Sequence, residues 1–246
     1  MASPAVVGTP VETAIITAST SHVVNLPAGT AGNVMLAIMS KGSAGTTPSV
    51  NALTGWNEII DEAIVLGLYA AARQCDGTEG ATTTFTLSSA TRGAWIVYEL
   101  SGAANPTVTL PQIGTTATGS SATPDPPASA APPSSKDYLF VAFAGMAGEE
   151  ADDDTWGNTP PTNYTPSPPR QKTCGTAGTN LGGLILSAER ALTTGSAENP
   201  GTFGVDVSAA WRANTITVHP APPMYEFEVE PVLARWPDES RVTVWS

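Results

Sequence analysis

The chain alternates between short apolar runs and stretches rich in Gly, Pro, Ser and Thr. The strongest run lies in residues 136–145 (KDYLFVAFAG), where a charged pair precedes a continuous apolar segment. Such a run is too short for a typical helix, and the Pro/Ser-rich segment before it marks the start of a new element. We therefore expect a buried strand here, and a similar run at residues 33–39 predicts a second one.

Further segments have the length and the alternation of strands. In residues 82–87, Phe85 and Leu87 alternate with threonines and should point inward. By the same rule Phe203, Val205 and Val207 should share one face. An Ala-rich helix is an alternative for the second half of residues 63–73. The other strands are expected at residues 5–17, 21–26, 63–73, 93–100, 107–113, 183–192 and 214–219.

This pattern predicts an all-β protein, an antiparallel β-sandwich of jelly-roll-like type. Hydrophobic residues make up 41% of the 246 residues and charged residues 13%, with 23 Gly and 22 Pro, which fits many strands joined by tight turns. The prolines of residues 114–135 exclude a central strand, so this segment should cross the surface or link two domains. Residues 148–169 should form an acidic, Pro-rich loop.

An internal echo suggests two halves. Residues 33–39 align with 137–143, Phe85 aligns with Phe203, and Arg92 aligns with Arg212. We expect one domain over residues 1–223, with pseudo-repeated halves at about 1–113 and 136–223 and a crossover at 114–135. The halves could interleave in one sandwich or form two small sandwiches in tandem, or the echo could be chance. Interleaving is favoured, because each half alone has few strands and a thin core.

The charge and the cysteines exclude several classes of protein. A net charge of −12 repels phosphate groups, so we expect no nucleic-acid partner and no membrane partner. The N-terminal residues lack the pattern of a signal peptide, and no apolar run approaches the roughly 20 residues of a membrane span. Cys75 and Cys174 should be free buried thiols, with a disulfide between the halves as the alternative.

No catalytic, cofactor or metal signature is present. The two histidines, His22 and His219, lie at expected strand edges, and the chain has no Gly-x-Ser-x-Gly, P-loop or Cys-x-x-Cys motif. A Ser-His-Asp triad assembled from distant residues is the weakest alternative. The acidic run at residues 149–154 lacks EF-hand spacing, so a solvated loop is favoured over a calcium site. We therefore expect a non-enzymatic protein without cofactors.

Three aromatic residues lie in loop-like stretches. Trp56, Trp156 and Tyr164 could stack on sugar rings and form a carbohydrate-binding site. The favoured alternative is that they cap the open ends of the core.

Several pieces occur in a recognisable order: PAGTAGNVMLAIMS, LGLYAAARQ, GAWIVYELSGA, PPSSKDYLFVAFAG and ENPGTFGVDVSAAWRANTITVHPAP. Together they resemble a β-sandwich domain of bacteriophage virion proteins that occupies tail, fibre or head-surface positions. The resemblance covers about residues 4–223. It implies a structural or adhesive role in the virion, assembled in the bacterial cytoplasm, with other capsid or tail proteins as partners and a homo-oligomeric state. A receptor-binding adhesin that recognises a cell-surface glycan is the alternative.

Residues 224–246 fall outside the resemblance and form an expected C-terminal β arm. Tyr225, Phe227 and Val229 alternate with glutamates, which predicts a strand with one wet face. Such a strand can add to the sheet edge of a neighbour, or it can fold back on its own domain. The expected docking residues are Tyr225, Phe227, Val229, Trp236 and Trp245.

Overall fold

The structure, a computed structural model, describes residues 3–42, 47–148, 157–175 and 182–223. This described part is all-β, with 57% of its residues in strands, no helix, and antiparallel pairing throughout the sheets. The described residues accordingly contain no helix that could span a membrane. The predicted fold class is confirmed at this level. The arm at residues 224–246, with all its expected docking residues, lies outside the described residues, as do Trp156 and the acidic run at 149–154.

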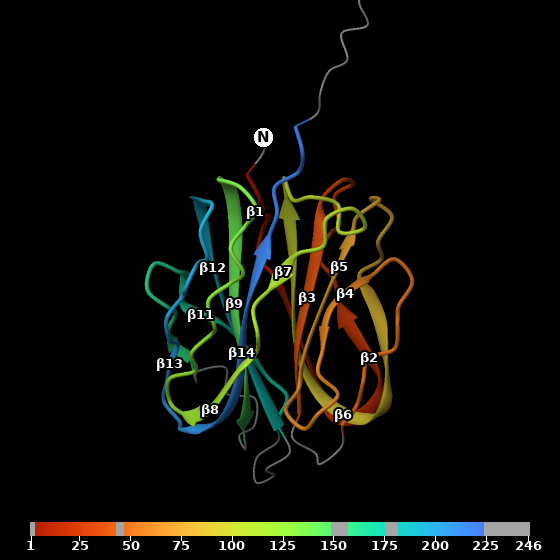
Figure 1. The fold of residues 1–246 in the computed structure, drawn as a ribbon. Coiled ribbons are helices and arrows are strands. Elements are labelled where there is room, and N and C mark those ends of the chain that lie inside the picture. Colours follow the sequence, from red (N-terminus) through yellow and green to blue (C-terminus); the bar gives the residue numbers. More distant parts are fainter. Residues whose placement is uncertain (1–2, 43–46, 149–156, 176–181, 224–246) are drawn as a thin grey trace, which may run out of the picture.

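Two six-stranded sheets make up most of the molecule (Figure 1). The first sheet has the order β1-β6-β3-β5-β4, with β2 also paired to β6. Its strands are β1 (Ala5–Val6), β2 (Val11–Asn25), β3 (Val34–Lys41), β4 (Asn57–Asp61), β5 (Leu68–Gln74) and β6 (Thr82–Ser101).

The second sheet has the order β11-β12-β9-β14-β7, with β8 also paired to β14. Its strands are β7 (Gln112–Ile113), β8 (Ala117–Ser121), β9 (Lys136–Gly148), β11 (Thr165–Thr173), β12 (Gly182–Thr194) and β14 (Ala209–Val218). A separate pair joins β10 (Gly157–Thr159) to β13 (Gly204–Val205).

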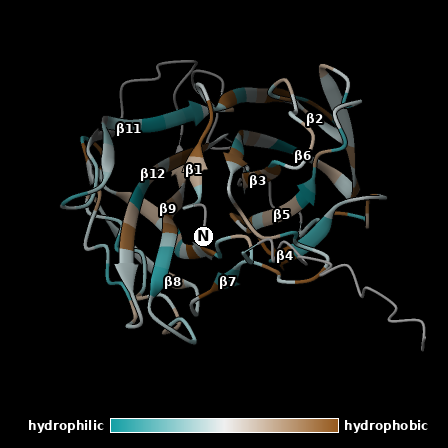
Figure 2. Ribbon diagram, turned by 90° about the horizontal axis from the view of Figure 1, so that it is seen from above, coloured by the Kyte–Doolittle hydropathy of each residue, from teal (hydrophilic) through white to brown (hydrophobic). Residues whose placement is uncertain are grey.

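The two sheets have the same connectivity. The path β6-β3-β5-β4 of the first sheet corresponds to β14-β9-β12-β11 of the second, in the same chain order. Two more strands pair with β6, namely β1 and β2, and two more pair with β14, namely β7 and β8. Each sheet comes from one continuous part of the chain, so the predicted interleaving of the halves is wrong for the strands described. Figure 2 shows the two groups of strands side by side.

The sheets share a hydrophobic core. β3 contributes Val34, Leu36 and Ile38 to it, and β9 contributes residues such as Val141 and Phe143. The opposite faces of the same strands are buried as well, in one further cluster for each sheet. Burial on both faces explains why the two predicted central strands are apolar without interruption instead of alternating.

The alignment of residues 33–39 with residues 137–143 differs by one residue from the way the side chains of β3 and β9 face in the structure. It equates Leu36 with Phe140, but Leu36 faces the core shared by the sheets whereas Phe140 faces the separate cluster of the second sheet. A shift of one residue moves a strand's side chains to the other face. Phe85 and Phe203, by contrast, both lie in the outer clusters, as their alignment requires.

Several expected boundaries differ from the observed ones. The two strands expected at residues 82–87 and 93–100 are one long strand, β6, in which Phe85 and Leu87 are buried as predicted. Residues 63–67, expected to begin a strand, form a turn instead. Val207 is exposed, because the strand that carries Val205 ends before it.

A strand also occurs where a loop was expected. β11 contains Pro166, Pro168 and Pro169 and begins within the last five residues of the predicted acidic, Pro-rich loop. Among the described strands it pairs with β12 alone, and its register shifts between Thr165 and Arg170. A strand on the edge of a sheet tolerates prolines because its outer N–H groups need no partner strand.

The sheets approach closely where β9 meets β3. A Cβ atom on Gly145 would lie 2.6 Å from the Ser40 hydroxyl oxygen and 2.8 Å from Leu68 Cδ2. Only a residue without a side chain allows this approach. The contact lies beside the candidate site described next.

Candidate functional site

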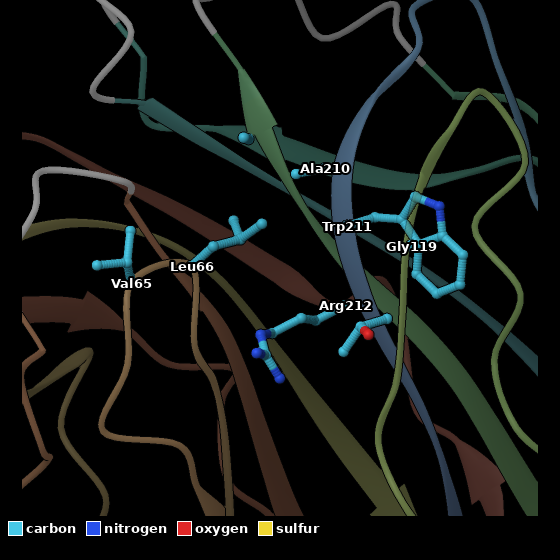
Figure 3. A pocket seen from close by; sticks show the side chains of 8 residues that line it. Val65, Leu66, Gly119, Ala210, Trp211 and Arg212 are labelled. Carbon is cyan, nitrogen blue, oxygen red and sulfur yellow. The ribbon is translucent and has the colours of Figure 1, made fainter.

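A pocket of about 540 Å³ opens between the two sheets (Figure 3). One wall is the turn between β4 and β5, with Val65 and Leu66, and the other comes from the second sheet. We call it the inter-sheet pocket. Its lining from the second sheet comprises Thr118, Gly119, Ala147, Ala210, Trp211 and Arg212.

Arg212, one of the lining residues, forms an ion pair with the first sheet. Arg212 Nη1 lies 3.5 Å from Glu62 Oε1, and the other oxygen of Glu62 accepts a hydrogen bond from the Leu68 N–H at 3.1 Å. Figure 3 shows the Arg212 side chain extending toward the turn that carries Leu66. The charge of Arg212 is therefore balanced by the opposite sheet, and the pair links the two sheets at this end.

The turn opposite Arg212 has an unusual backbone. Leu66 adopts a φ of 56°, a region that residues with a side chain rarely occupy. The next residue must be glycine, because a Cβ on Gly67 would lie 2.1 Å from the Glu62 carbonyl oxygen. This conformation buries the Leu66 side chain and leaves Val65 exposed.

Trp211 closes the other side of the pocket. Its ring packs on Gly119, where a Cβ would lie 2.4 Å from the ring atom Cζ2, and its Nε1–H donates to the Ser121 hydroxyl at 3.0 Å. Figure 3 shows the ring turned away from Arg212 and against the strand of Gly119. Its neighbours on β8 hold the indole in one orientation.

A buried lysine supports the turn from behind. Lys41 Nζ donates to an oxygen of Asp61, to the Pro48 carbonyl at 2.8 Å and to the Glu62 carbonyl at 2.8 Å. Burial lowers the pKa of Lys41, while its hydrogen bond to Asp61 acts in the opposite direction. Since all three ammonium donors are used, Lys41 serves the structure and is not a free amine nucleophile.

The inter-sheet pocket has few polar groups. Its described lining is mostly apolar, its one charged side chain is paired, and it contains no pair of nucleophile and base. Across the described part of the chain, no three His, Cys, Asp or Glu side chains converge on a point that could hold a metal ion.

His22 is enclosed in the first sheet. Its Nε2 lies 3.0 Å from the Thr91 carbonyl oxygen, and its Nδ1 accepts a hydrogen bond from Trp95 Nε1 at 3.1 Å. These contacts fix the tautomer with the proton on Nε2, and burial lowers the pKa of the ring. With both nitrogens used, this histidine cannot act as a general base.

His219 has different surroundings. It follows β14 and packs edge-on against Tyr138, with ring centroids 5.5 Å apart. Its Nε2 is buried and has no hydrogen-bond partner among the described residues. Burial, followed by the charge of Lys136, lowers the pKa of His219.

Both cysteines are free and buried. Cys75 belongs to the outer cluster of the first sheet and Cys174 to the core shared by the sheets. Burial raises the pKa of Cys75 to about 11 and that of Cys174 to about 12. The two thiols are therefore protonated and unreactive at neutral pH.

Two of the three aromatic residues considered for sugar binding are described, and both are buried. Trp56 is 9% exposed and packs against Phe85, with ring centroids 5.2 Å apart, and Tyr164 is 4% exposed in the outer cluster of the second sheet. Neither ring presents an open face on which a sugar could stack. The structure does not bring a glycan-binding surface together around them.

Sequence reasoning missed the inter-sheet pocket. Arg212 was noted only as a counterpart of Arg92, and Glu62 and Lys41 were not singled out. A charged residue at the end of an apolar strand, as Lys41 is at the end of β3, is a signal that could have indicated a buried ion pair.

Comparisons with known proteins give no relative. The sequence matches no family model, and no curated protein and no solved structure is significantly similar to the chain.

Proposed function

We propose that this protein is a non-enzymatic structural subunit on the surface of a bacteriophage particle. It is a capsid decoration, head-fibre or tail component whose body, residues 3–223, projects from the particle. Residues 224–246 attach it to a neighbouring protein. The family resemblance of the sequence motivates this proposal, and one structural observation supports it further.

That observation is that the first and the last residues of the body are both hydrogen-bonded to the same segment, residues 99–104. Residues 99–104 are hydrogen-bonded on one side to the entering chain, through Val7 N–H and Glu99 O at 2.8 Å. On the other side they hold the leaving chain, through Ala221 N–H and Gly102 O at 2.8 Å and Ala104 N–H and His219 O at 2.8 Å. Both ends therefore lie at one end of the molecule (Figure 1).

This arrangement suits a subunit that is held by one end. A force applied to the chain beyond Pro223 would be resisted by the backbone hydrogen bonds of His219 and Ala221. These bonds lie next to the core shared by both sheets. The inter-sheet pocket lies toward the other end of β14, where Arg212 pairs with Gly145. It would thus face away from the attachment.

We also propose that the body is a β-sandwich of two pseudo-repeated halves that pack face to face. The matching strand orders and the shared core support this proposal. In this proposal the halves are residues 5–101 and 112–218, instead of the expected 1–113 and 136–223, and β7 and β8 open the second half. The prolines that follow β8 belong to that half as well.

Immunogold electron microscopy tests the function. Antibodies raised against the purified protein are applied to purified particles of the phage that encodes it. Labelling of the particle surface is expected. Absence of the protein from purified particles, checked by mass spectrometry of the same sample, would falsify the proposal.

A further inference from the structure

A groove of about 510 Å³ lies at the end of the molecule where the chain leaves the body. Its walls include the segment after β6, strand β7 and the segment after β14. We call it the terminal groove. The lining residues that matter here are Val108, Leu110, Gln112, Lys136, His219 and Pro222.

The groove exposes apolar surface. Val108 is 82% exposed, the largest value among the large hydrophobic residues described, and Leu110 is 40% exposed. Two such residues side by side in one groove, with Pro133, Pro220 and Pro222 around them, form a patch that water solvates poorly.

The same groove contains polar atoms without partners. His219 Nε2 and Gln112 Oε1 are buried and find no hydrogen-bond partner among the described residues. Buried polar groups are normally satisfied, so a segment that displaces the atoms covering these two groups would gain hydrogen bonds to them. An extended peptide carries the N–H and C=O groups that both atoms need.

The edge of the second sheet lies beside these atoms. β7 ends the path of that sheet and pairs, within the described chain, only with β14. Strand addition at such an edge combines main-chain hydrogen bonds with pockets for alternate side chains. Residues 224–230 (MYEFEVE) have the matching pattern, because apolar Tyr225, Phe227 and Val229 alternate with glutamates. The negative charges of these glutamates complement the positive charge of Lys136 in the groove lining.

We propose that the terminal groove receives residues 224–230 of a second copy of this chain. A second copy is favoured over the same chain by the direction in which the body ends. The backbone contacts of His219 and Ala221 carry the chain along the segment at residues 102–104 and away from the body (Figure 1). Residues 224–246 reach about 75 Å when extended, far enough to meet a neighbour. The inference rests on the proposed function, since it gives the attachment segment its receiving site.

Cysteine trapping in the full chain tests the pairing. Val108→Cys and Phe227→Cys are made in separate, differently tagged copies that are co-expressed and then oxidised. We expect a disulfide-linked heterodimer on non-reducing gels, with the 108–227 link identified by mass spectrometry. The native thiols do not compete, because Cys75 and Cys174 are buried. The matched control places the first cysteine at Val23, which is 51% exposed on β2, and should give no link.

The double variant V108C/F227C, with both cysteines in one chain, shows whether the segment in the groove comes from the same chain or from a second copy. Links between copies support the proposal, whereas a purely intramolecular link overturns it in favour of the chain's own arm. A 108–227 link no more frequent than the Val23 control also overturns it.

A second measurement does not depend on cysteines. The variant V108E should lower the association of the full chain at least tenfold in sedimentation equilibrium. Its urea midpoint should stay unchanged, because Val108 is largely exposed. Unchanged association would contradict the inference. If this protein is found on purified particles but the 108–227 link does not form, the inference about the terminal groove fails and the proposed function still stands.

Discussion

The hydroxyl oxygen of Tyr98 lies 2.6 Å from that of Ser187, and this hydrogen bond joins the two sheets inside their shared core. Tyr98 is fully buried on β6, and Ser187 is fully buried on β12. The guanidinium of Arg170 lies over the Tyr98 ring, 5.7 Å from its centroid, and forms an ion pair with Glu189 at 2.7 Å. A polar cluster thus fixes the position of one sheet on the other.

Removing this hydrogen bond should destabilise the body. Tyr98→Phe leaves the Ser187 hydroxyl buried without its partner, which should lower the free energy of unfolding by about 1–3 kcal/mol. Urea denaturation measures the change. The Y98F/S187A double variant is the control: its loss should be smaller than the sum of the two single losses. Strict additivity would show that the two hydroxyls do not interact.

The buried ion pair of Lys41 and Asp61 should be sensitive to the loss of one partner. Lys41→Met leaves the Asp61 carboxylate without its counter-charge and should cost about 3–5 kcal/mol of unfolding free energy. The K41M/D61N variant should recover part of that loss, because neither side chain is then charged. A double variant as unstable as K41M alone would argue that packing, not charge, explains the effect.

The close approach at Gly145 should not tolerate a side chain. Gly145→Ala places a Cβ against Ser40 and Leu68, so the sheets must shift, and we expect a loss of about 1–3 kcal/mol. Thermal unfolding of Gly145→Ala and of a control variant, Gly80→Ala, measures the effect. Gly80→Ala is the matched control, since the nearest atom to its Cβ is 3.8 Å away and the change should be nearly neutral. Equal effects at both positions would refute the close contact.

His22 should make stability depend on pH. Its folded pKa lies below the ordinary value of 6.5, so the unfolded chain binds the proton more readily than the folded one. The neutral ring therefore contributes stability that is present above about pH 6.5 and is lost as the pH falls below it, with a slope of at most about 1.4 kcal/mol per pH unit.

Urea denaturation between pH 7.5 and 5 at constant ionic strength measures this dependence. His22→Gln replaces the imidazole with a polar amide that does not titrate, so the difference in stability between wild type and variant should shrink as the pH falls. His219, whose pKa is also lowered, stays in both proteins as an internal reference. A difference that does not change with pH would contradict the assignment.

Much of the fold could be predicted from patterns of a few residues. The buried run at residues 136–145 is β9, and the similar run at 33–39 is β3, both central in their sheets. The inward orientation of Phe85 and Leu87 also followed from alternation. Local patterns report burial well, because apolar residues are buried whichever neighbour covers them.

The same patterns could not say which neighbour covers each face. When both faces of a strand are apolar, no alternation marks its inner side, and the alignment of β3 with β9 was therefore wrong by one residue. The prolines of β11 suggested a loop, because only the finished sheet shows that this strand lies on an edge. The inter-sheet pocket could not be predicted for a similar reason, since Glu62 and Arg212 are distant in the sequence and meet only when the sheets pack.

The sequence by itself determined that the protein is all-β, which of its runs are buried, and that its charge is strongly negative, since these properties depend on composition and on near neighbours along the chain. Only the tertiary structure decided that the first and second parts of the chain form separate sheets, that Trp56 and Tyr164 are buried, and that the Nε2 atom of His219 has no hydrogen-bond partner among the described residues. Those outcomes depend on contacts between residues far apart in the chain, and such contacts are set by packing and leave no local pattern.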